Sequence, residues 1–87
     1  MSVKVYNLNY VKDMPTITQY DVSGINLGDL LECLENEYGP EVKRTLLTDG
    51  RLAERARVSI NGRLARSLND AIPDGGQVMF SLMLPGG

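Results

Sequence analysis

The chain has 87 residues, a net charge of −2, an apolar fraction of 43% and a charged fraction of 23%, which is the composition of one small globular domain. It contains no histidine and one cysteine, so imidazole catalysis, histidine metal ligands, internal disulfides and cysteine-cluster metal sites are excluded. The slightly acidic balance argues against nucleic acid as a partner. No apolar run approaches the length of a membrane helix or a signal peptide, so we expect no membrane association and a cytoplasmic location.

Two strands are predicted at the start of the chain. Residues 2–10 alternate, with Val3 and Val5 on one parity and Tyr6 and Leu8 on the other, and the pattern leaves open which parity faces inward. A polar turn ends at Pro15, and residues 16–22 are again rich in β-branched and aromatic side chains. The two segments therefore predict an antiparallel hairpin.

A helix follows, marked by a leucine stripe at helical spacing. Asn26 is the expected N-cap and Gly39-Pro40 the stop signal. The stripe consists of Leu27, Leu30, Leu31, Leu34 and Tyr38. Cys33 lies beside it and is expected to be half-buried and structural. The opposite face carries Glu32, Glu35 and Glu37, which we interpret as a solubilising face.

The second half of the chain predicts shorter elements. Residues 40–48 suit a short helix, residues 51–56 give no clear signal, and residues 57–60 suit a strand. Asn61-Gly62 predicts a tight hairpin turn into a return strand over 63–65. The basic side chains here are expected to form a solvated surface; they are Arg51, Arg55, Arg57, Arg63 and Arg66.

The last predicted strand covers residues 77–84, after a turn at 74–76. Its inward parity consists of Val78, Phe80, Leu82 and Leu84. Met79 and Met83 take the other face, where flexible methionine side chains suit a docking surface for partner proteins. A hairpin, a crossing helix and further strands predict an α+β fold of the β-grasp type, with the first and last strands parallel at the centre of the sheet.

The chain closes with Leu84-Pro85-Gly86-Gly87. Two glycines have no side chains to block a narrow channel, and Pro85 cannot extend a sheet. The α-carboxylate of Gly87 becomes a good acyl donor once a partner enzyme joins it to AMP from ATP. We therefore predict a single domain over residues 1–87, with residues 84–87 as a flexible reactive tail.

The whole chain resembles the ubiquitin-like sulfur-carrier family, and within it the small subunit of molybdopterin synthase. The resemblance rests on the opening strand, on the leucine-rich helix around residues 28–34, on the strand ending in Asn61-Gly62, and on the turn, strand and Gly86-Gly87 that close the chain. The family turn is usually Asp-Gly-Asp/Glu, and here Gly76 replaces the acidic residue. The tail is also more apolar than is usual.

The resemblance implies a carrier subunit that performs no catalysis and holds no tightly bound cofactor. An E1-like adenylyltransferase would activate Gly87 with ATP, and sulfur from a persulfide donor would leave a thiocarboxylate there. The charged carrier would then dock on a larger catalytic subunit and give sulfur to a pterin precursor of the molybdenum or tungsten cofactor. Gly86 would provide access, while Leu84 and Pro85 would line the entrance of the tail.

Three other interpretations stay open. The same activated Gly87 would make the chain a ubiquitin-like modifier if it were joined to lysines of target proteins. A sulfur carrier for another product, such as thiamine, would use the same chemistry. A plain interaction domain would not need the terminal glycines at all.

Overall fold

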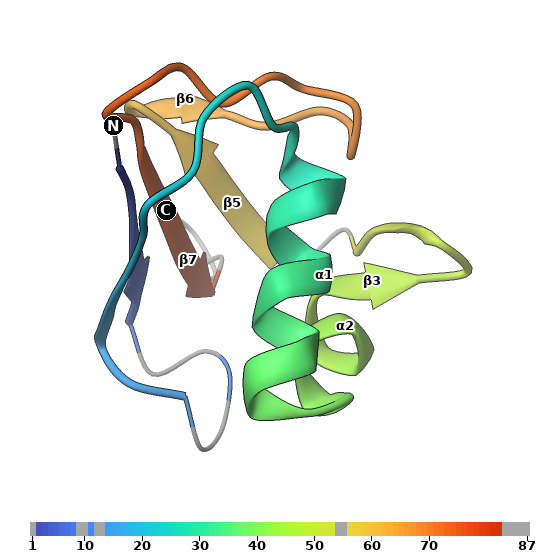
Figure 1. The fold of residues 1–87 in the computed structure, drawn as a ribbon. Helices are drawn as coiled ribbons and strands as arrows, with labels where there is room; N and C mark the ends of the chain where they lie inside the picture. Colours follow the sequence, from blue (N-terminus) through green and yellow to red (C-terminus); the bar gives the residue numbers. More distant parts are fainter. Residues whose placement is uncertain (1, 9–10, 12–13, 54–55, 83–87) are drawn as a thin grey trace.

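The computed structural model describes residues 2–8, 11, 14–53 and 56–82. The main sheet has the strand order β2-β1-β7-β5-β6 (Figure 1). The neighbouring strands β1 and β7 are parallel, and every other pair of neighbouring strands in this sheet is antiparallel. The predicted α+β fold of β-grasp type is confirmed, including the parallel central pair. In chain order the elements are β1 (Val3–Asn7), β2 (Ile17–Tyr20), α1 (Leu27–Tyr38), α2 (Glu41–Leu46), β3 (Leu47–Thr48), β4 (Arg51–Leu52), β5 (Ala56–Ile60), β6 (Arg63–Leu64) and β7 (Gln77–Leu82).

Helix α1 begins and ends where its capping residues dictate. The Asn26 side chain accepts a hydrogen bond from the Asp29 amide at 2.8 Å, and the Asp29 carboxylate accepts one from the Asn26 amide at 3.2 Å. This reciprocal pair satisfies two amides that a helix start leaves free. Gly39 has φ 97° and donates its amide to the Glu35 carbonyl, which ends the helix.

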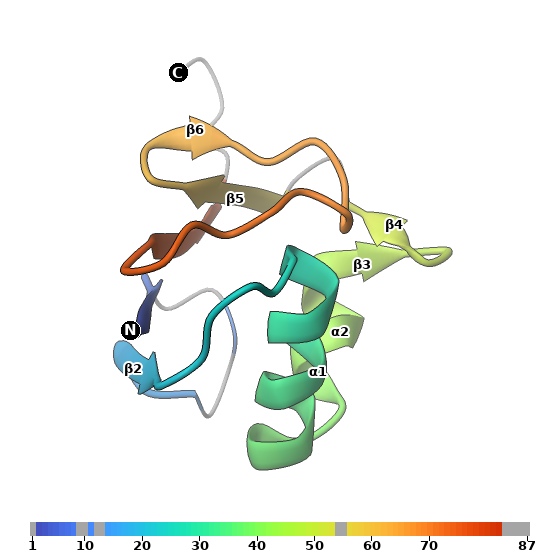
Figure 2. The same ribbon diagram turned by 45° about the horizontal axis from the view of Figure 1, so that its top comes forward.

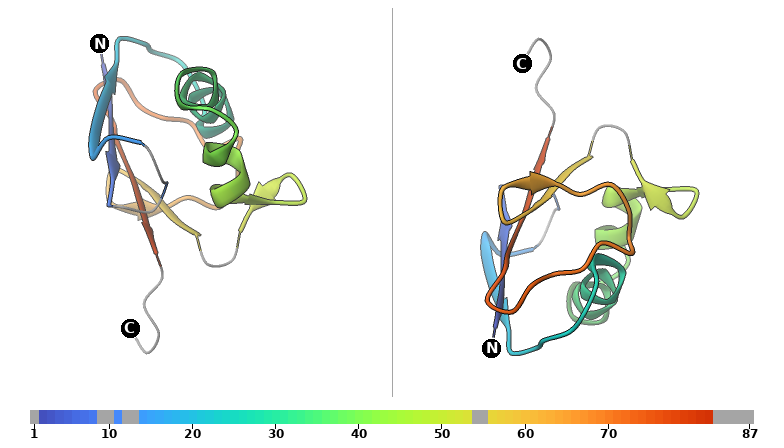
Figure 3. Two further views of the ribbon diagram at one scale, coloured as in Figure 1. Left: turned by 90° about the horizontal axis from the view of Figure 1, so that it is seen from below. Right: turned by 90° about the horizontal axis from the view of Figure 1, so that it is seen from above.

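The core lies between the sheet and the helices. Figure 3 shows both helices on one side of the sheet, and the opposite face carries no element among the described residues. The four leucines of the stripe on α1 are fully buried and face the inward parity of the strands, where Phe80 is the largest fully buried side chain, and Tyr38 is half-buried. The inward residues of the sheet include Val3, Val5, Val58, Val78 and Phe80. Burial of these side chains is the main source of stability for so small a domain.

The open question about the first strand is settled by a buried polar residue. Val3, Val5 and Asn7 face the core, and Asn7 is only 1% exposed. Its side-chain amide donates to the carbonyls of Val11 at 2.9 Å and Met14 at 3.1 Å, and its oxygen accepts from the Val11 amide at 2.9 Å. Asn7 therefore holds the loop that follows β1 against the core, because its polar atoms are satisfied by the backbone of that loop.

The turn at Asn61-Gly62 also forms as predicted. Both residues have positive φ, 52° and 83°, the combination that suits a two-residue hairpin. The Asn61 side-chain oxygen accepts from the Gln77 amide at 2.8 Å, and the Asn61 amide donates to the Gln77 carbonyl at 2.8 Å. These two bonds fix the hairpin against the start of β7.

Several elements differ in extent from the sequence prediction. The first two strands are shorter than expected, at 3–7 and 17–20 instead of 2–10 and 16–22. The short helix ends at Leu46, and a small hairpin of β3 and β4, which the sequence did not reveal, forms around Asp49 and Gly50 (Figure 2). Asp49 has φ 53° and Gly50 φ 79°, so the turn chemistry was present in the sequence, but its strands are too short to show alternation.

Candidate functional site

The central strand β7 leads directly into the predicted reactive tail. β7 lies between β1 and β5 and is described to Leu82. Residues 83–87, and with them the predicted roles of Met83, Leu84, Pro85, Gly86 and Gly87, lie outside the described part of the chain. The structure shows that β7, the strand before the tail, is paired with a neighbouring strand on each side.

The face of the sheet without helices carries one row of aligned side chains. Ile17 pairs with Tyr6, and Tyr6 pairs with Met79. Met79 in turn pairs with Ser59, and Ser59 with Leu64. Paired residues in a sheet project to the same face, so one row of side chains crosses all five strands.

Apolar exposure is concentrated on this face. Among the described residues the large exposed apolar side chains are Leu8 (51%), Ile17 (59%), Leu64 (58%) and Met79 (39%). Ile17, Leu64 and Met79 belong to the row, and strand alternation puts Leu8 on the same face, two residues beyond Tyr6. A gathering of this kind on a small protein marks an interaction surface. We call Tyr6, Leu8, Ile17, Leu64 and Met79 the outer apolar face.

Polar side chains border the outer apolar face along the same strands. Lys4 pairs with Gln77 at one end of β7, and Arg57 pairs with Ser81 at the other. Lys4, Gln77 and Arg57 are exposed, and Ser81 is half-buried. An apolar centre with a polar rim is the usual anatomy of a protein–protein interface.

Met79 is thus exposed on the helix-free side, where the sequence placed it. The other members of the outer apolar face were not identified from the sequence. Strand parity puts Tyr6 and Leu8 on one face of the first strand. The sequence alone does not show whether that face points to the core or to solvent. Ile17 and Leu64 required the register between strands, which the sequence does not contain.

The acidic face of α1 does more than the solubilising role expected of it. Lys43 of α2 binds Glu32 at 2.6 Å and Glu35 at 3.5 Å, which ties the two helices together. The Tyr20 hydroxyl donates to Glu37 at 2.6 Å and links β2 to α1. Burial and this hydrogen bond to the Glu37 carboxylate raise the pKa of Tyr20 above its ordinary value.

The pKa of Lys43 is raised as well, because its ammonium group donates a hydrogen bond to the Glu32 carboxylate.

Cys33 is half-buried, as predicted. Within residues 2–8, 11, 14–53 and 56–82, no three His, Cys, Asp or Glu side chains come together in a way that would hold a metal ion. In the same part of the chain no helix has the length and apolar character needed to cross a membrane.

Comparison with known proteins shows which solved structures share the fold of this chain. No family model and no curated protein sequence matches the chain. The chain is similar in structure to small archaeal modifier protein 1 from Haloferax volcanii, with 20% identity, a TM-score of 0.73, and coverage of 95% of this chain and 98% of that one. Urm1 from Trypanosoma brucei matches with 26% identity, a TM-score of 0.72, and coverage of 99% and 95%.

A third match is the complex of subunits 1 and 2 of the molybdopterin-converting factor from Helicobacter pylori, with 20% identity and a TM-score of 0.62. It covers 100% of both chains. The resemblance expected from the sequence is therefore confirmed at the level of structure. The solved structures that this β-grasp chain resembles thus include a small archaeal modifier protein, Urm1 and the complex of the molybdopterin-converting factor.

Proposed function

We propose that the protein is a sulfur carrier whose active form ends at Gly87 and carries a thiocarboxylate there. The observation that carries the proposal is the position of Gly86-Gly87. They follow within five residues of Leu82, the last described residue of the central strand β7, so two residues without side chains come shortly after the central strand in the chain. The structural neighbours named above support a carrier or modifier role of this kind.

The proposed chemistry begins at the Gly87 carboxylate. An E1-like adenylyltransferase uses ATP to form the acyl adenylate and releases pyrophosphate. The terminal sulfur of a donor persulfide then attacks the acyl carbon and displaces AMP, which gives an acyl disulfide. A thiol reductant cleaves the sulfur–sulfur bond and leaves the thiocarboxylate on Gly87. The chain supplies the acyl group only, so it acts as a co-substrate, and we assign the route to the cytoplasm, where ATP is available.

The outer apolar face supports this proposal because it offers a surface by which partner proteins can bind the domain. An activating enzyme and a larger catalytic subunit must each hold the domain while its tail enters their active sites. Met79, at the centre of the row, is the member of that face that the central strand itself contributes, and it lies three residues before Leu82. We assign Met79 to partner binding, and we assign Met83, Leu84 and Pro85 to contacts of the tail at the entrance of the partner's site.

We infer molybdopterin synthesis as the destination of the sulfur, with a pterin precursor as acceptor. The match to the two-subunit molybdopterin-converting factor supports this destination. A modifier role, in which Gly87 is joined to lysines of target proteins, is the second candidate. It is supported by the match to small archaeal modifier protein 1.

One experiment separates these candidates by product. The protein, its activating enzyme, ATP, a persulfide donor and a thiol reductant are incubated first with a pterin precursor and the larger subunit, and separately with cell protein. Formation of a dithiolene pterin supports the carrier. Target peptides in which a lysine carries residues 67–87, the segment that trypsin leaves after Arg66, support the modifier. A variant without Gly86 and Gly87 should give neither product, and if it forms either one the role of the tail is refuted.

A further inference from the structure

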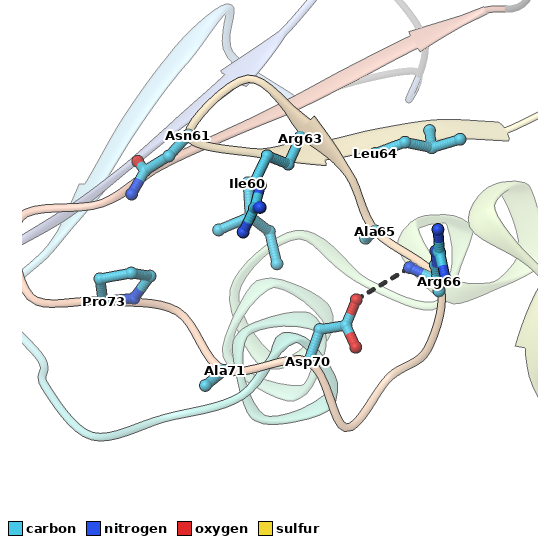
Figure 4. Close-up of a pocket in the computed structure, with 9 residues that line it drawn as sticks. All are labelled: Ile60, Asn61, Arg63, Leu64, Ala65, Arg66, Asp70, Ala71 and Pro73. Carbon is cyan, nitrogen blue, oxygen red and sulfur yellow. Dashed lines mark hydrogen bonds between the residues drawn. The ribbon is translucent and has the colours of Figure 1, made fainter.

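A second surface lies along the β5–β6 hairpin. It is an open groove of about 780 Å³ between this hairpin and the segment 66–73. Figure 4 shows Arg63 beside Ile60 along the groove, with Arg66 and Asp70 at one end and Asn61 and Pro73 at the other. The role proposed for Gly87 does not involve this groove.

The hairpin wall of the groove is a free sheet edge. β6 is the last strand of the sheet, and the Ala65 amide donates to the Val58 carbonyl at 2.7 Å. Hydrogen-bonded and non-bonded pairs alternate in an antiparallel ladder. The next pair, Ser59 and Leu64, is therefore a non-bonded pair, and the amide and carbonyl of Leu64 point away from β5.

The opposite wall also carries unused backbone groups. Ala71 forms a bridge with Asn26, flanked by bonds from the Ile72 amide to the Ile25 carbonyl and from the Leu27 amide to the Asp70 carbonyl. This arrangement makes Ala71 a non-bonded pair with Asn26, so its own amide and carbonyl point away from that residue. Neither group has a partner among the described residues. Unpaired strand-like backbone is a template for another extended chain.

The charges of the groove fix the kind of chain that suits it. Arg63 and Arg66 are exposed, and neither forms an ion pair with a described residue, although the protein as a whole has a net charge of −2. The one carboxylate in the groove belongs to Asp70, and it accepts a hydrogen bond from the Arg66 amide at 2.8 Å. Two exposed guanidinium groups at an open edge favour carboxylates, which arginine binds in two-pronged geometry.

We propose that this groove binds an extended acidic segment of a partner protein. The segment pairs with the Leu64 backbone at the edge of β6, and its Asp or Glu side chains bind Arg63 and Arg66. Strand addition provides the backbone contacts and the charges provide selectivity. The groove and the outer apolar face meet at Leu64, whose backbone lies at the groove and whose side chain belongs to the outer apolar face.

The test uses the full chain, labelled with nitrogen-15, and the capped peptide Val-Glu-Val-Glu-Val-Glu as the probe. Saturable amide shift changes are expected at residues 63–66 and at Ala71. The same peptide methylated on every second backbone nitrogen should bind much more weakly, because it loses the donors that pair with a strand edge. Shift changes centred on β1 and β7, no saturable change, or equal binding of the methylated peptide would each refute the proposal.

Charge reversal provides the second readout. Arg63→Glu combined with Arg66→Glu should weaken binding of the acidic peptide by about tenfold or more and allow the matching Val-Lys peptide to bind. Arg44→Glu combined with Arg51→Glu makes the same change in net charge at exposed residues outside the groove and should leave affinity within about twofold. An equal loss in both double variants would show attraction by net charge alone. If the first pair does not fold, Arg63→Gln with Arg66→Gln replaces it.

Discussion

Tyr6 and Met79 lie opposite each other on the parallel central strands β1 and β7, and both belong to the sheet face that lies away from α1 and α2, the helices of the described residues (Figure 3). This pair is the middle of the row that Ile17 extends on one side and Leu64 on the other. Because β7 also precedes the tail, a partner that binds Tyr6 and Met79 also holds the strand that comes before Gly86-Gly87 in the chain. Under the proposed function, the strand that contacts the partner is therefore also the one that precedes the reactive residues in the chain.

The first prediction concerns Met79 as the centre of the partner contact. Met79→Glu should lower the rate of activation by the adenylyltransferase by about tenfold or more, because a carboxylate in a desolvated apolar contact carries a large cost. Stability should change little, since the side chain is exposed in the free protein. The readouts are ATP–pyrophosphate exchange and the midpoint of thermal unfolding.

A matched control for Met79 lies on the same strand and face. Gln77→Glu adds the same carboxylate at the polar rim beside Lys4, and its activation rate should stay near that of the unmodified protein. If Gln77→Glu and Met79→Glu are equally impaired, the defect comes from charge alone and the outer apolar face is not the contact.

The second prediction concerns the buried Asn7. Asn7→Ala should reduce the free energy of unfolding by about 3 kcal/mol, because it leaves polar backbone groups of Val11 and Met14 without their partner. Urea unfolding measures this loss. Asn36→Ala, on the exposed face of α1, should cost well under half as much, and equal losses would mean that the loop does not depend on Asn7.

The third prediction concerns alkaline pH. The pKa of Tyr20 is raised in the folded protein, by burial first and then by Glu37. Tyrosine in the unfolded chain loses its proton near pH about 10, so the stabilising contribution of Tyr20 is complete below that pH and is lost as the pH rises further. Tyr20→Phe should therefore lose less stability than the unmodified protein when urea unfolding is compared at about pH 9 and about pH 11.

Tyr6→Phe is the control for this alkaline effect, since it removes a hydroxyl but leaves the contact between Tyr20 and Glu37 in place. It should keep the full loss of stability above pH about 10. If Tyr20→Phe shows the same pH dependence as Tyr6→Phe, Tyr20 does not hold its proton in the folded state.

The fourth prediction concerns Gly76, which stands where the resembling family has an acidic residue. A Cβ at Gly76 would lie 2.8 Å from the Pro73 carbonyl oxygen and 3.1 Å from a methyl group of Ile72. Gly76→Ala should therefore reduce the free energy of unfolding by about 1–3 kcal/mol through overpacking. An unchanged urea midpoint would show that the turn adjusts freely. The close approach explains why glycine suits this position.

The sequence predicted those features that local chemistry specifies. The leucine stripe, the Asn26 cap, the Asn61-Gly62 turn and the inward Val78 and Phe80 each appear where they were expected. The order of these elements was enough to predict the β-grasp topology. Met79 was placed on the exposed face for the same reason, since strand parity is a local property.

What sequence reasoning missed depends on contacts between distant segments. Asn7 is buried because its side chain bonds to backbone groups four and seven residues later, after the strand has ended. The alternation of the strand does not predict a polar residue at a core position. Ile17 and Leu64 join Met79 only through the register of five strands. The groove at β6 likewise requires the segment 66–73 to fold back beside the hairpin.

The central claim is that Gly87 becomes a thiocarboxylate, and intact-mass spectrometry tests it most directly. The untagged protein is incubated with its activating enzyme, ATP, a persulfide donor and a thiol reductant, beside a variant that lacks Gly87. The account predicts the loss of one oxygen and the gain of one sulfur in the full chain, dependent on ATP, and no change in the shortened variant. An unchanged mass of the full chain, with an enzyme that activates another carrier in the same assay, would contradict it.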